Sequence, residues 1–300
     1  MKPNAQTLIL GGTTWDHIIQ LPEFPGTEPK TIHQAVFFEG TGSTGAGKAL
    51  PLHQLGVPCS LYSVLGDDYY GKQVIDFLTQ RGLTYRIITD PAGTERHVNL
   101  MNHSGERISI FITNSTEQVD HDFEWLQQAI DQADVIVLNI ISYCKALAPI
   151  VKQSGKPVWT DLHDYDGRNS YHQPFIDAAS HIHLSSDSLP DYRSLMQQFI
   201  ENGKELVVCT HGKAGATLLD REGNWLEQEA LTHFPQVDTN GAGDHFFAGF
   251  YYGWIGGKSG KHCLELGAVA AALCVGSRQI SPESLNAQTL QSVWSNQFGK

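Results

Sequence analysis

The 300-residue sequence has few positive charges, no closely paired cysteines and no long apolar run. Its 20 basic residues are outnumbered by 32 acidic ones, which gives a formal charge of −12. This imbalance argues against binding to nucleic acid and against binding to an anionic membrane surface. It does not exclude a small anionic ligand, because a few backbone N–H groups can hold one locally.

The five cysteines are far apart, odd in number and form no C-x-x-C pair, which is typical of reduced, mostly buried thiols. No apolar run approaches the roughly 18 residues of a membrane span. The apolar stretch near the beginning is too short for a signal peptide, so we expect a cytoplasmic location. The 14 histidines do not have the spacing of a zinc site, so we expect no histidine metal site.

Short apolar runs alternate with amphipathic segments along most of the chain. One such segment carries Val74, Phe77 and Leu78 on a single helical face. This alternation predicts an α/β fold with a central, mostly parallel sheet, helices on both faces, and ligands at the carboxyl ends of the strands. The expected strands are Thr7–Leu10, Ser60–Val64, Val135–Ile140, Val158–Leu162, His181–Leu184 and Glu205–Thr210, followed by a hairpin of Ala216–Asp220 and Trp225–Glu229.

Two regions, residues 14–40 and 94–113, lack helical periodicity. Apolar and polar residues alternate in the second region, and a turn at residues 102–105 predicts a hairpin there. The first region predicts two short strands, Asp16–Leu21 and Thr31–Phe38. We therefore expect one domain spanning residues 1–300, with a small β-sheet lid built from these two interruptions.

A first glycine cluster runs from Gly40 to Ala49 and nearly spells the phosphate-binding pattern G-x-x-x-x-G-K-[ST]. Ala49 lacks the hydroxyl that the pattern requires, and no continuous apolar strand leads into Gly42. The cluster is equally a glycine-rich turn before a helix over Lys48–Leu55, or a backbone that lets a ligand approach closely. On this interpretation Lys48 is a solvated helix residue.

A second cluster, Asp238-Thr-Asn-Gly-Ala-Gly-Asp244, precedes an apolar helical segment. The N–H groups of Gly241, Ala242 and Gly243, together with the helix dipole, can form an anion site. Asp244 is either a first-turn carboxylate of ordinary capping type or a general base. An acid beside an anion hole suits phosphoryl transfer, because the acid accepts the proton of the attacking hydroxyl while the amides hold the developing charge.

The second cluster, followed by Ala248-Gly249, resembles the C-terminal signature of the PfkB (ribokinase-like) carbohydrate kinase family. The resemblance extends over the whole chain. Its other parts are Leu8–Gly12 with Asp16, the stretch from Gly42 to Gly56, the G-D-D-x-x-G of Gly66–Gly71, and the T-x-G-x-x-G of Thr210–Gly215.

The resemblance implies a ribokinase-like fold and ATP-dependent phosphorylation of a hydroxyl on a sugar-like small molecule, with Mg²⁺ accompanying ATP. Asp244 would be the base, and Gly241, Ala242 and Gly243 the anion hole. The implied substrate-binding residues are Asp16, Gly42, Gly45, Ala46 and Gly47. The implied nucleotide-binding residues are Thr210, Gly212 and Gly215. A monovalent cation such as K⁺ would lie near Asp238 and Thr239.

The resemblance also implies a homodimer formed through the lid. The alternating face of Ile108, Ile110 and Ile112 fits such pairing, and it fits equally well with covering the site.

Two departures from the family pattern affect the expected substrate and metal. Gly47 stands where the family has an asparagine that binds the sugar, which puts a ribose- or fructose-type acceptor in doubt and leaves room for a bulkier one. Ser185–Ser188 stands where the family often has N-x-x-E, so metal placement would be weaker or different, with Asp187 substituting in part. The alternatives are a nucleoside kinase of the same fold and a catalytically weak sugar- or nucleotide-binding regulator.

Overall fold

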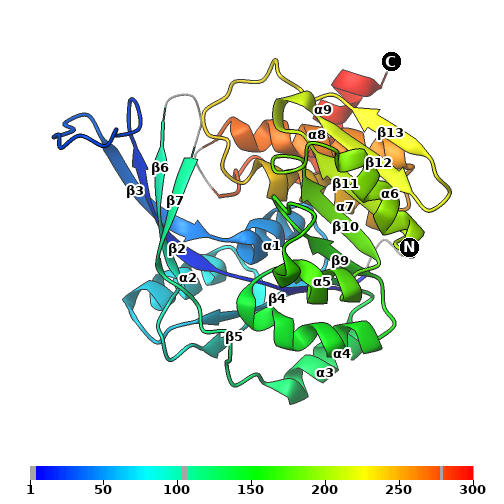
Figure 1. Cartoon of the computed structure of the whole chain (residues 1–300), viewed down its shortest axis with the longest axis horizontal. Helices are drawn as coiled ribbons and strands as arrows, with labels where there is room; N and C mark the ends of the chain where they lie inside the picture. Colours follow the sequence, from blue (N-terminus) through cyan, green and yellow to red (C-terminus); the bar gives the residue numbers. More distant parts are fainter. Residues whose placement is uncertain (1–4, 103–106, 278–279, 300) are drawn as a thin grey trace.

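The computed structural model describes residues 5–102, 107–277 and 280–299. These residues form a nine-stranded main sheet flanked by helices and a separate four-stranded small sheet beside it (Figure 1). Among them, no helix is both long enough and apolar enough to cross a membrane. All five cysteines are free thiols, and four of them are buried.

The main sheet has the strand order β13-β12-β11-β10-β9-β8-β1-β4-β5. Its strands are parallel except for β12 and β13, which form an antiparallel edge. The strands are β1 (Thr7–Leu10), β4 (Cys59–Leu65), β5 (Thr84–Thr89), β8 (Val135–Asn139), β9 (Val158–Asp161), β10 (His181–Ser185), β11 (Leu206–Thr210), β12 (Ala216–Asp220) and β13 (Trp225–Gln228). The predicted α/β architecture is confirmed. β5 was not predicted, because this edge strand is only half covered and has no continuous apolar run.

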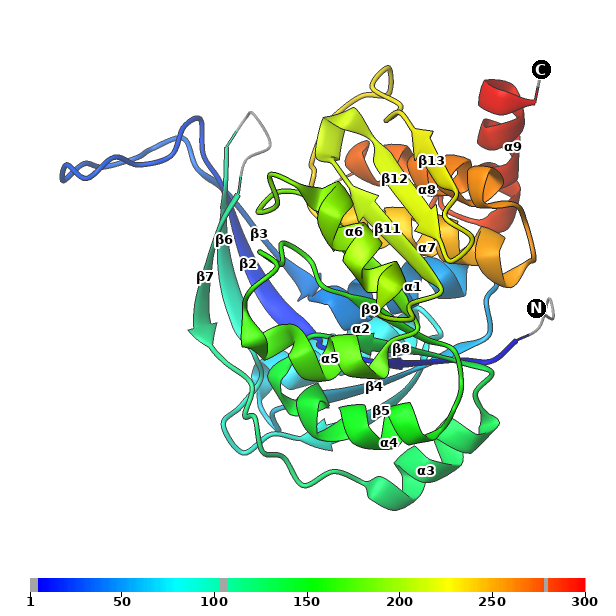
Figure 2. The same ribbon diagram turned by 45° about the vertical axis from the view of Figure 1, so that its right-hand side comes forward.

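Helices cover both faces of the main sheet (Figure 2). One face carries α1 (Thr44–Gln54), α2 (Tyr69–Gln80), α7 (Ala242–Ile255), α8 (Gly260–Val275) and α9 (Ala287–Phe298). The other carries α3 (Phe123–Gln132), α4 (Ala148–Gln153), α5 (Gln173–Ala178) and α6 (Tyr192–Glu201). Two apolar cores result, because alternate residues of each strand point to opposite faces: Ile9 packs into one core, and Leu8 and Leu10 into the other.

The small sheet has the order β3 (Val36–Gly42), β2 (Thr14–Gln20), β6 (Arg96–Met101), β7 (Arg107–Thr113). It is built from the two interruptions that the sequence indicated. The strand expected over Thr31–Phe38 is misplaced, because pairing with β2 begins only at Val36 and continues to Gly42. The turn expected at residues 102–105 falls largely outside the described residues.

Helix α1 begins four residues earlier than the expected Lys48–Leu55, and the strand that leads into it, β3, is mostly exposed rather than a continuous apolar run. Gly45 and Gly47 therefore lie in the first turn of the helix rather than in a turn before it, whereas Gly40 and Gly42 are among the last residues of β3. A Cβ at Gly45 would lie 2.5 Å from backbone atoms of Gly11 and Gly12, so the glycine lets α1 lie directly on the chain that follows β1. The Ala46 N–H accordingly donates to the Gly12 carbonyl at 3.1 Å.

Candidate active site

The order in which strands are added to the main sheet reverses at β1: β4 and β5 lie on one side of it, and β8 to β13 lie on the other. A crevice is therefore expected where the carboxyl ends of β1 and β8 diverge. The ends of the two strands are joined there by the buried Asn139, whose side-chain N–H donates to the Leu10 carbonyl at 3.0 Å. Helices α1 and α7 begin at this same edge of the sheet and pack against each other. The predicted catalytic and acceptor residues gather around these two helix starts.

Asp244 lies in the first turn of α7, as predicted. The helix is preceded by Gly241 in the left-handed conformation (φ 77°), which glycine adopts without steric cost. A Cβ added at Gly243 would meet no atom within 4 Å, so this side of the helix start is open. The Ala242 N–H donates to the Thr239 carbonyl at 3.3 Å. The Asp244 side chain is 16% exposed.

Lys48 is fully buried, so its interpretation as a solvated residue is wrong. Its ammonium lies 2.5 Å from Asp244 Oδ1 and 2.9 Å from Asp161 Oδ2, which joins α1 to the ends of α7 and β9. The burial was missed because the two carboxylates that face Lys48 lie more than 100 residues away in the sequence. The burial is tolerated because two carboxylates face the ammonium.

Gly47 is brought directly against Asp244. A Cβ at position 47 would lie 2.4 Å from Asp244 Oδ2 and 3.0 Å from its Cγ. The absence of a side chain at this position therefore makes space for the carboxylate itself. The neighbouring Ala46 is buried in the same turn of α1.

The buried charges of this cluster stabilise one another. Burial alone would lower the pKa of Lys48, but the facing carboxylates of Asp161 and Asp244 raise it above its usual value. Burial would raise the pKa of Asp161, but His163, Lys48 and His183 hold it well below its usual range. Lys48 and Asp161 are therefore both charged at neutral pH.

Asp16 lies on β2 of the small sheet and is 6% exposed. It accepts hydrogen bonds from Thr14 at 2.7 Å and from Asn99 at 3.2 Å. Burial raises its pKa, and the hydrogen bond from Thr14 opposes this shift. A Cβ at Gly42 would lie 2.1 Å from Asp16 Oδ2, so Gly42 is needed for this carboxylate to fit.

Two residues of this group were missed from the sequence, His97 and Asn99 of β6. The register places His97 beside Asp16, with its Nδ1 3.6 Å from Asp16 Oδ1. Asn99 donates to Asp16 and accepts a hydrogen bond from the Ser109 hydroxyl at 2.7 Å. The alternation of β6 was visible in the sequence, but its pairing with β2 was not.

The expected nucleotide-binding residues lie at the carboxyl end of β11 and in the turn to β12. Thr210 ends β11 and donates to the Leu184 carbonyl at 3.3 Å. Gly212 opens a short 3-10 turn and faces free space, whereas a Cβ at Gly215 would lie 2.0 Å from the Gln228 carbonyl oxygen. The neighbouring His211, which was not singled out, bonds Ser186 and Thr217 at 2.9 Å each.

The segment before α7 is tied both to the small sheet and to α8. Arg107 of β7 donates to the Asn240 side chain at 2.5 Å. The Asp238 carboxylate accepts from the Asn240 N–H at 2.8 Å, and the Asp238 N–H donates to the Val275 carbonyl at 3.1 Å. Across the described parts of the chain, no three His, Cys, Asp or Glu side chains are grouped so as to hold a metal ion.

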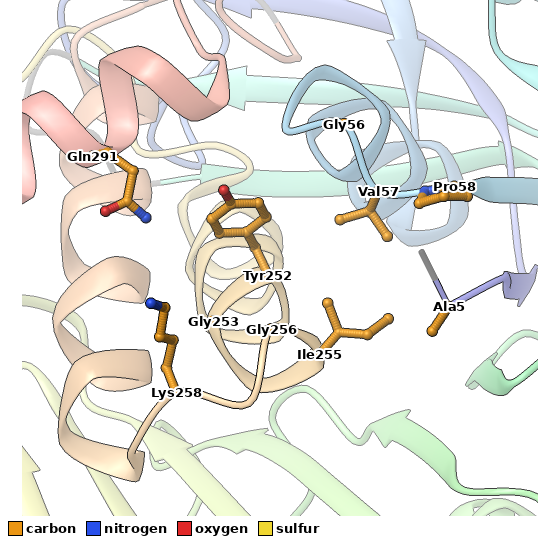
Figure 3. Close-up of a pocket in the computed structure, with 10 residues that line it drawn as sticks. All are labelled: Ala5, Gly56, Val57, Pro58, Tyr252, Gly253, Ile255, Gly256, Lys258 and Gln291. Carbon is orange, nitrogen blue, oxygen red and sulfur yellow. The ribbon is translucent and has the colours of Figure 1, made fainter. Parts of the chain in front are cut away.

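A cavity of about 360 Å³ lies near the amino ends of β1 and β4, whereas the candidate site lies at the carboxyl ends of the strands (Figure 3). Its lining includes Val57 just before β4, Tyr252 in the last turn of α7 and Lys258 in the segment that follows α7. Ligands of open parallel sheets bind at the carboxyl ends of the strands. This cavity is at the amino ends, so it is not part of the candidate site.

Comparison with known proteins agrees with this geometry. Residues 175–286 match the model of the pfkB family carbohydrate kinases. The chain is 32% identical over 277 residues to an acarbose 7(IV)-phosphotransferase of Actinoplanes sp., covering 91% of this chain and 92% of that protein. It is 25% identical to a ribokinase of Arabidopsis thaliana, covering 89% of this chain and 75% of that protein.

Solved structures show the same likeness. A microbiome-derived acarbose kinase superposes with a TM-score of 0.86 at 26% identity, covering 97% of this chain and 99% of that one. The Arabidopsis thaliana ribokinase complexed with ribose and ATP superposes with a TM-score of 0.78 at 20% identity, covering 97% and 99%, which shows the shared fold.

The fold and the site define a sugar kinase of ribokinase-like architecture. The chain belongs to the PfkB family of carbohydrate kinases. It is an ATP-dependent carbohydrate kinase, and the predicted family and enzyme class are confirmed.

Proposed function

We propose that this kinase transfers the γ-phosphoryl group of ATP to a hydroxyl of acarbose or of a similarly bulky carbohydrate. The observation that carries the proposal is the 32% identity, over nine-tenths of both chains, to a protein named as an acarbose phosphotransferase. The space left by the missing side chain at position 47 is occupied by the Asp244 carboxylate, so the sequence-based argument for a bulkier acceptor from Gly47 adds nothing to this observation.

In this proposal Asp244 is the general base. It accepts the proton of the attacking hydroxyl while that oxygen bonds to the γ-phosphorus and ADP departs. The N–H groups of Gly241, Ala242 and Gly243 hold the negative charge of the transferring group. Among them Gly243 borders the most open space, whereas the Ala242 N–H is shared with Thr239.

The acceptor would bind between the small sheet and the start of α1, so that the small sheet acts as a lid on a single kinase domain. Asp16 is the proposed hydroxyl-binding carboxylate, with His97 and Asn99 beside it on the same face. The floor of this site would be formed by Gly42, Gly45, Ala46 and Gly47. At the three glycines, neighbouring atoms occupy the space that a side chain would need.

ATP would lie across the turn between β11 and β12, against Thr210, Gly212 and Gly215. Gly212 is the residue that leaves space for a ligand, while Gly215 serves the packing of the turn. Mg²⁺ would arrive with ATP, since it is usually held through substrate phosphates and one or two carboxylates. Asp187, exposed beside Ser185 and Ser186, fits that limited role, and Mg²⁺ when bound would neutralise phosphate charge. We place a monovalent cation near Asp238 and Thr239.

We also propose a cytoplasmic homodimer formed through the outer face of the small sheet. The register puts Phe111 on the same face as Asp16, so Ile108 and Ile110 face the opposite way, and both are exposed. This favours pairing over covering the site. Sedimentation should show a dimer for the native protein and a monomer for Ile110→Lys, whereas a monomeric native protein would contradict the proposal.

Release of ADP across a panel of acceptors tests the substrate. The panel contains acarbose, other oligosaccharides, ribose, fructose and nucleosides, each with and without K⁺. The proposal expects the highest kcat/KM with acarbose or another oligosaccharide. Nucleosides are included because a nucleoside kinase of Methanothermobacter thermautotrophicus is 26% identical over 92% of this chain. A preference for nucleosides or for ribose would contradict the proposal.

A further inference from the structure

The Lys48 ammonium binds only one oxygen of the proposed base. It lies 2.5 Å from Asp244 Oδ1, while the other oxygen, Oδ2, lies over the position where Gly47 lacks a side chain. The carboxylate is thus held at one oxygen and presented at the other. Such an arrangement fixes the rotamer of Asp244 through Oδ1 and leaves Oδ2, which lies against Gly47, outside the ion pair.

The second carboxylate near Lys48 is more deeply buried. Asp161 Oδ2 lies 2.9 Å from the ammonium, and Asp161 Oδ1 lies 3.2 Å from His183 Nδ1 and accepts the His163 N–H at 3.0 Å. If Asp244 becomes protonated during turnover, Lys48 still has Asp161 as its partner. No uncompensated buried charge is then created, which would otherwise be costly.

We propose that Lys48 is a positioning residue for phosphoryl transfer, which holds Asp244 Oδ1 so that Oδ2 accepts the proton of the acceptor hydroxyl, with Asp161 as its permanent counter-ion. The inference rests on the proposed role of Asp244 as base. In the step itself the acceptor O–H proton moves to Asp244 Oδ2, the acceptor oxygen bonds to the γ-phosphorus, and the bond from that phosphorus to the leaving ADP oxygen breaks.

The surroundings of the cluster supply no second cation of comparable closeness within the described residues. His245 on α7 is directed away, with Nδ1 2.9 Å from the Gly241 carbonyl and Nε2 3.1 Å from the Ser281 hydroxyl. Cys274 on α8 has its pKa raised to about 12 by burial, so it carries no charge at neutral pH. His163 and His183 face Asp161 rather than Asp244.

The test compares Lys48→Met with the double variant Lys48→Met/Asp161→Asn. The single variant leaves two carboxylates facing each other without their shared cation, so one of them binds a proton more tightly. We expect kcat at pH 7 to fall by about tenfold or more and the acid limb of its pH profile to move up by about one pH unit, with KM for ATP little changed. The double variant should return the acid limb to its native position.

Lys156→Met is the matched control. This lysine donates to the Asp131 carbonyl at 2.7 Å, at the amino end of β9, far from Asp244 along the strand direction. Its loss should lower stability and leave the pH profile of kcat unchanged. A native pH profile in Lys48→Met, or the same shifted profile in both Lys48 variants, would overturn the inference.

Unfolding by urea as a function of pH separates this inference from the proposed function. A carboxylate with a raised pKa in the folded state favours folding as pH falls. Relative to the native protein, Lys48→Met should therefore become more stable between pH 7 and pH 5, and the double variant should not. If the native protein turned over no acceptor, the proposed function would fail while this measurement still decided whether Lys48 holds the two carboxylates.

Discussion

The two glycine-rich helix starts look alike in sequence and differ in structure. At the start of α1, a Cβ at Gly42, Gly45 or Gly47 would lie within 2.5 Å of another atom, so these glycines are required by packing. At the start of α7, a Cβ at Gly243 would meet nothing within 4 Å. Glycine content alone therefore does not distinguish glycines that are required by close packing within the protein from glycines that leave space for a ligand.

The largest effect should come from the open helix start. Asp244→Asn preserves the size of the side chain but removes the proton acceptor, so kcat should fall by about 10²- to 10⁴-fold. Binding of ATP, measured by calorimetry, should stay within a few-fold of the native value. Turnover close to that of the native enzyme would remove Asp244 from its proposed role.

The packed helix start can be tested with one methyl group. In Gly47→Ala the new Cβ lies 2.4 Å from Asp244 Oδ2, so the carboxylate must move. We expect kcat to fall by about 10- to 100-fold, since a displacement of 1 Å can cost as much as 10²-fold. ADP release measures this, and a mutant with native kcat would show that Asp244 adapts without loss.

The smallest effect, and the most direct comparison, concerns stability. Gly45→Ala forces α1 away from the backbone after β1 and should lower the free energy of unfolding by about 2–3 kcal/mol. Gly243→Ala adds a methyl group in open space within a helix and should raise it by about 0.5–1 kcal/mol. Urea titrations give both values. If the two variants changed stability in the same direction, the distinction between the helix starts would be lost.

The sequence predicted the architecture well where short apolar runs mark buried strands, as at Thr7–Leu10 and His181–Leu184. It failed at Lys48, because the glycines before it were taken as a turn and its two partners lie far along the chain. Asp161 follows a strand and Asp244 begins a helix, and only folding brings both to α1. Local patterns therefore identify elements, but they do not reveal which distant elements come into contact.

The same limit separates the site residues that the sequence predicted from those that it missed. The sequence singled out Asp16 and Asp244 through motif resemblance, and the structure places Asp16 on β2 of the small sheet and Asp244 in the first turn of α7. It did not single out His97 or Asn99, because their nearness to Asp16 depends on parallel pairing between β2 and β6, and five other elements separate these two strands in the chain. Strand register of this kind leaves no local mark in a single sequence.

The hydrogen bond from Arg107 to Asn240 joins the segments that carry the two proposed ligand sites. It runs from the sheet that carries Asp16 to the segment that carries Gly241. Suppose an acceptor on the small sheet strengthens this bond and so improves ATP binding by some factor. Thermodynamic reciprocity then requires ATP to improve acceptor binding by the same factor. Through this one side-chain contact, the enzyme's affinity for each substrate would depend on the concentration of the other.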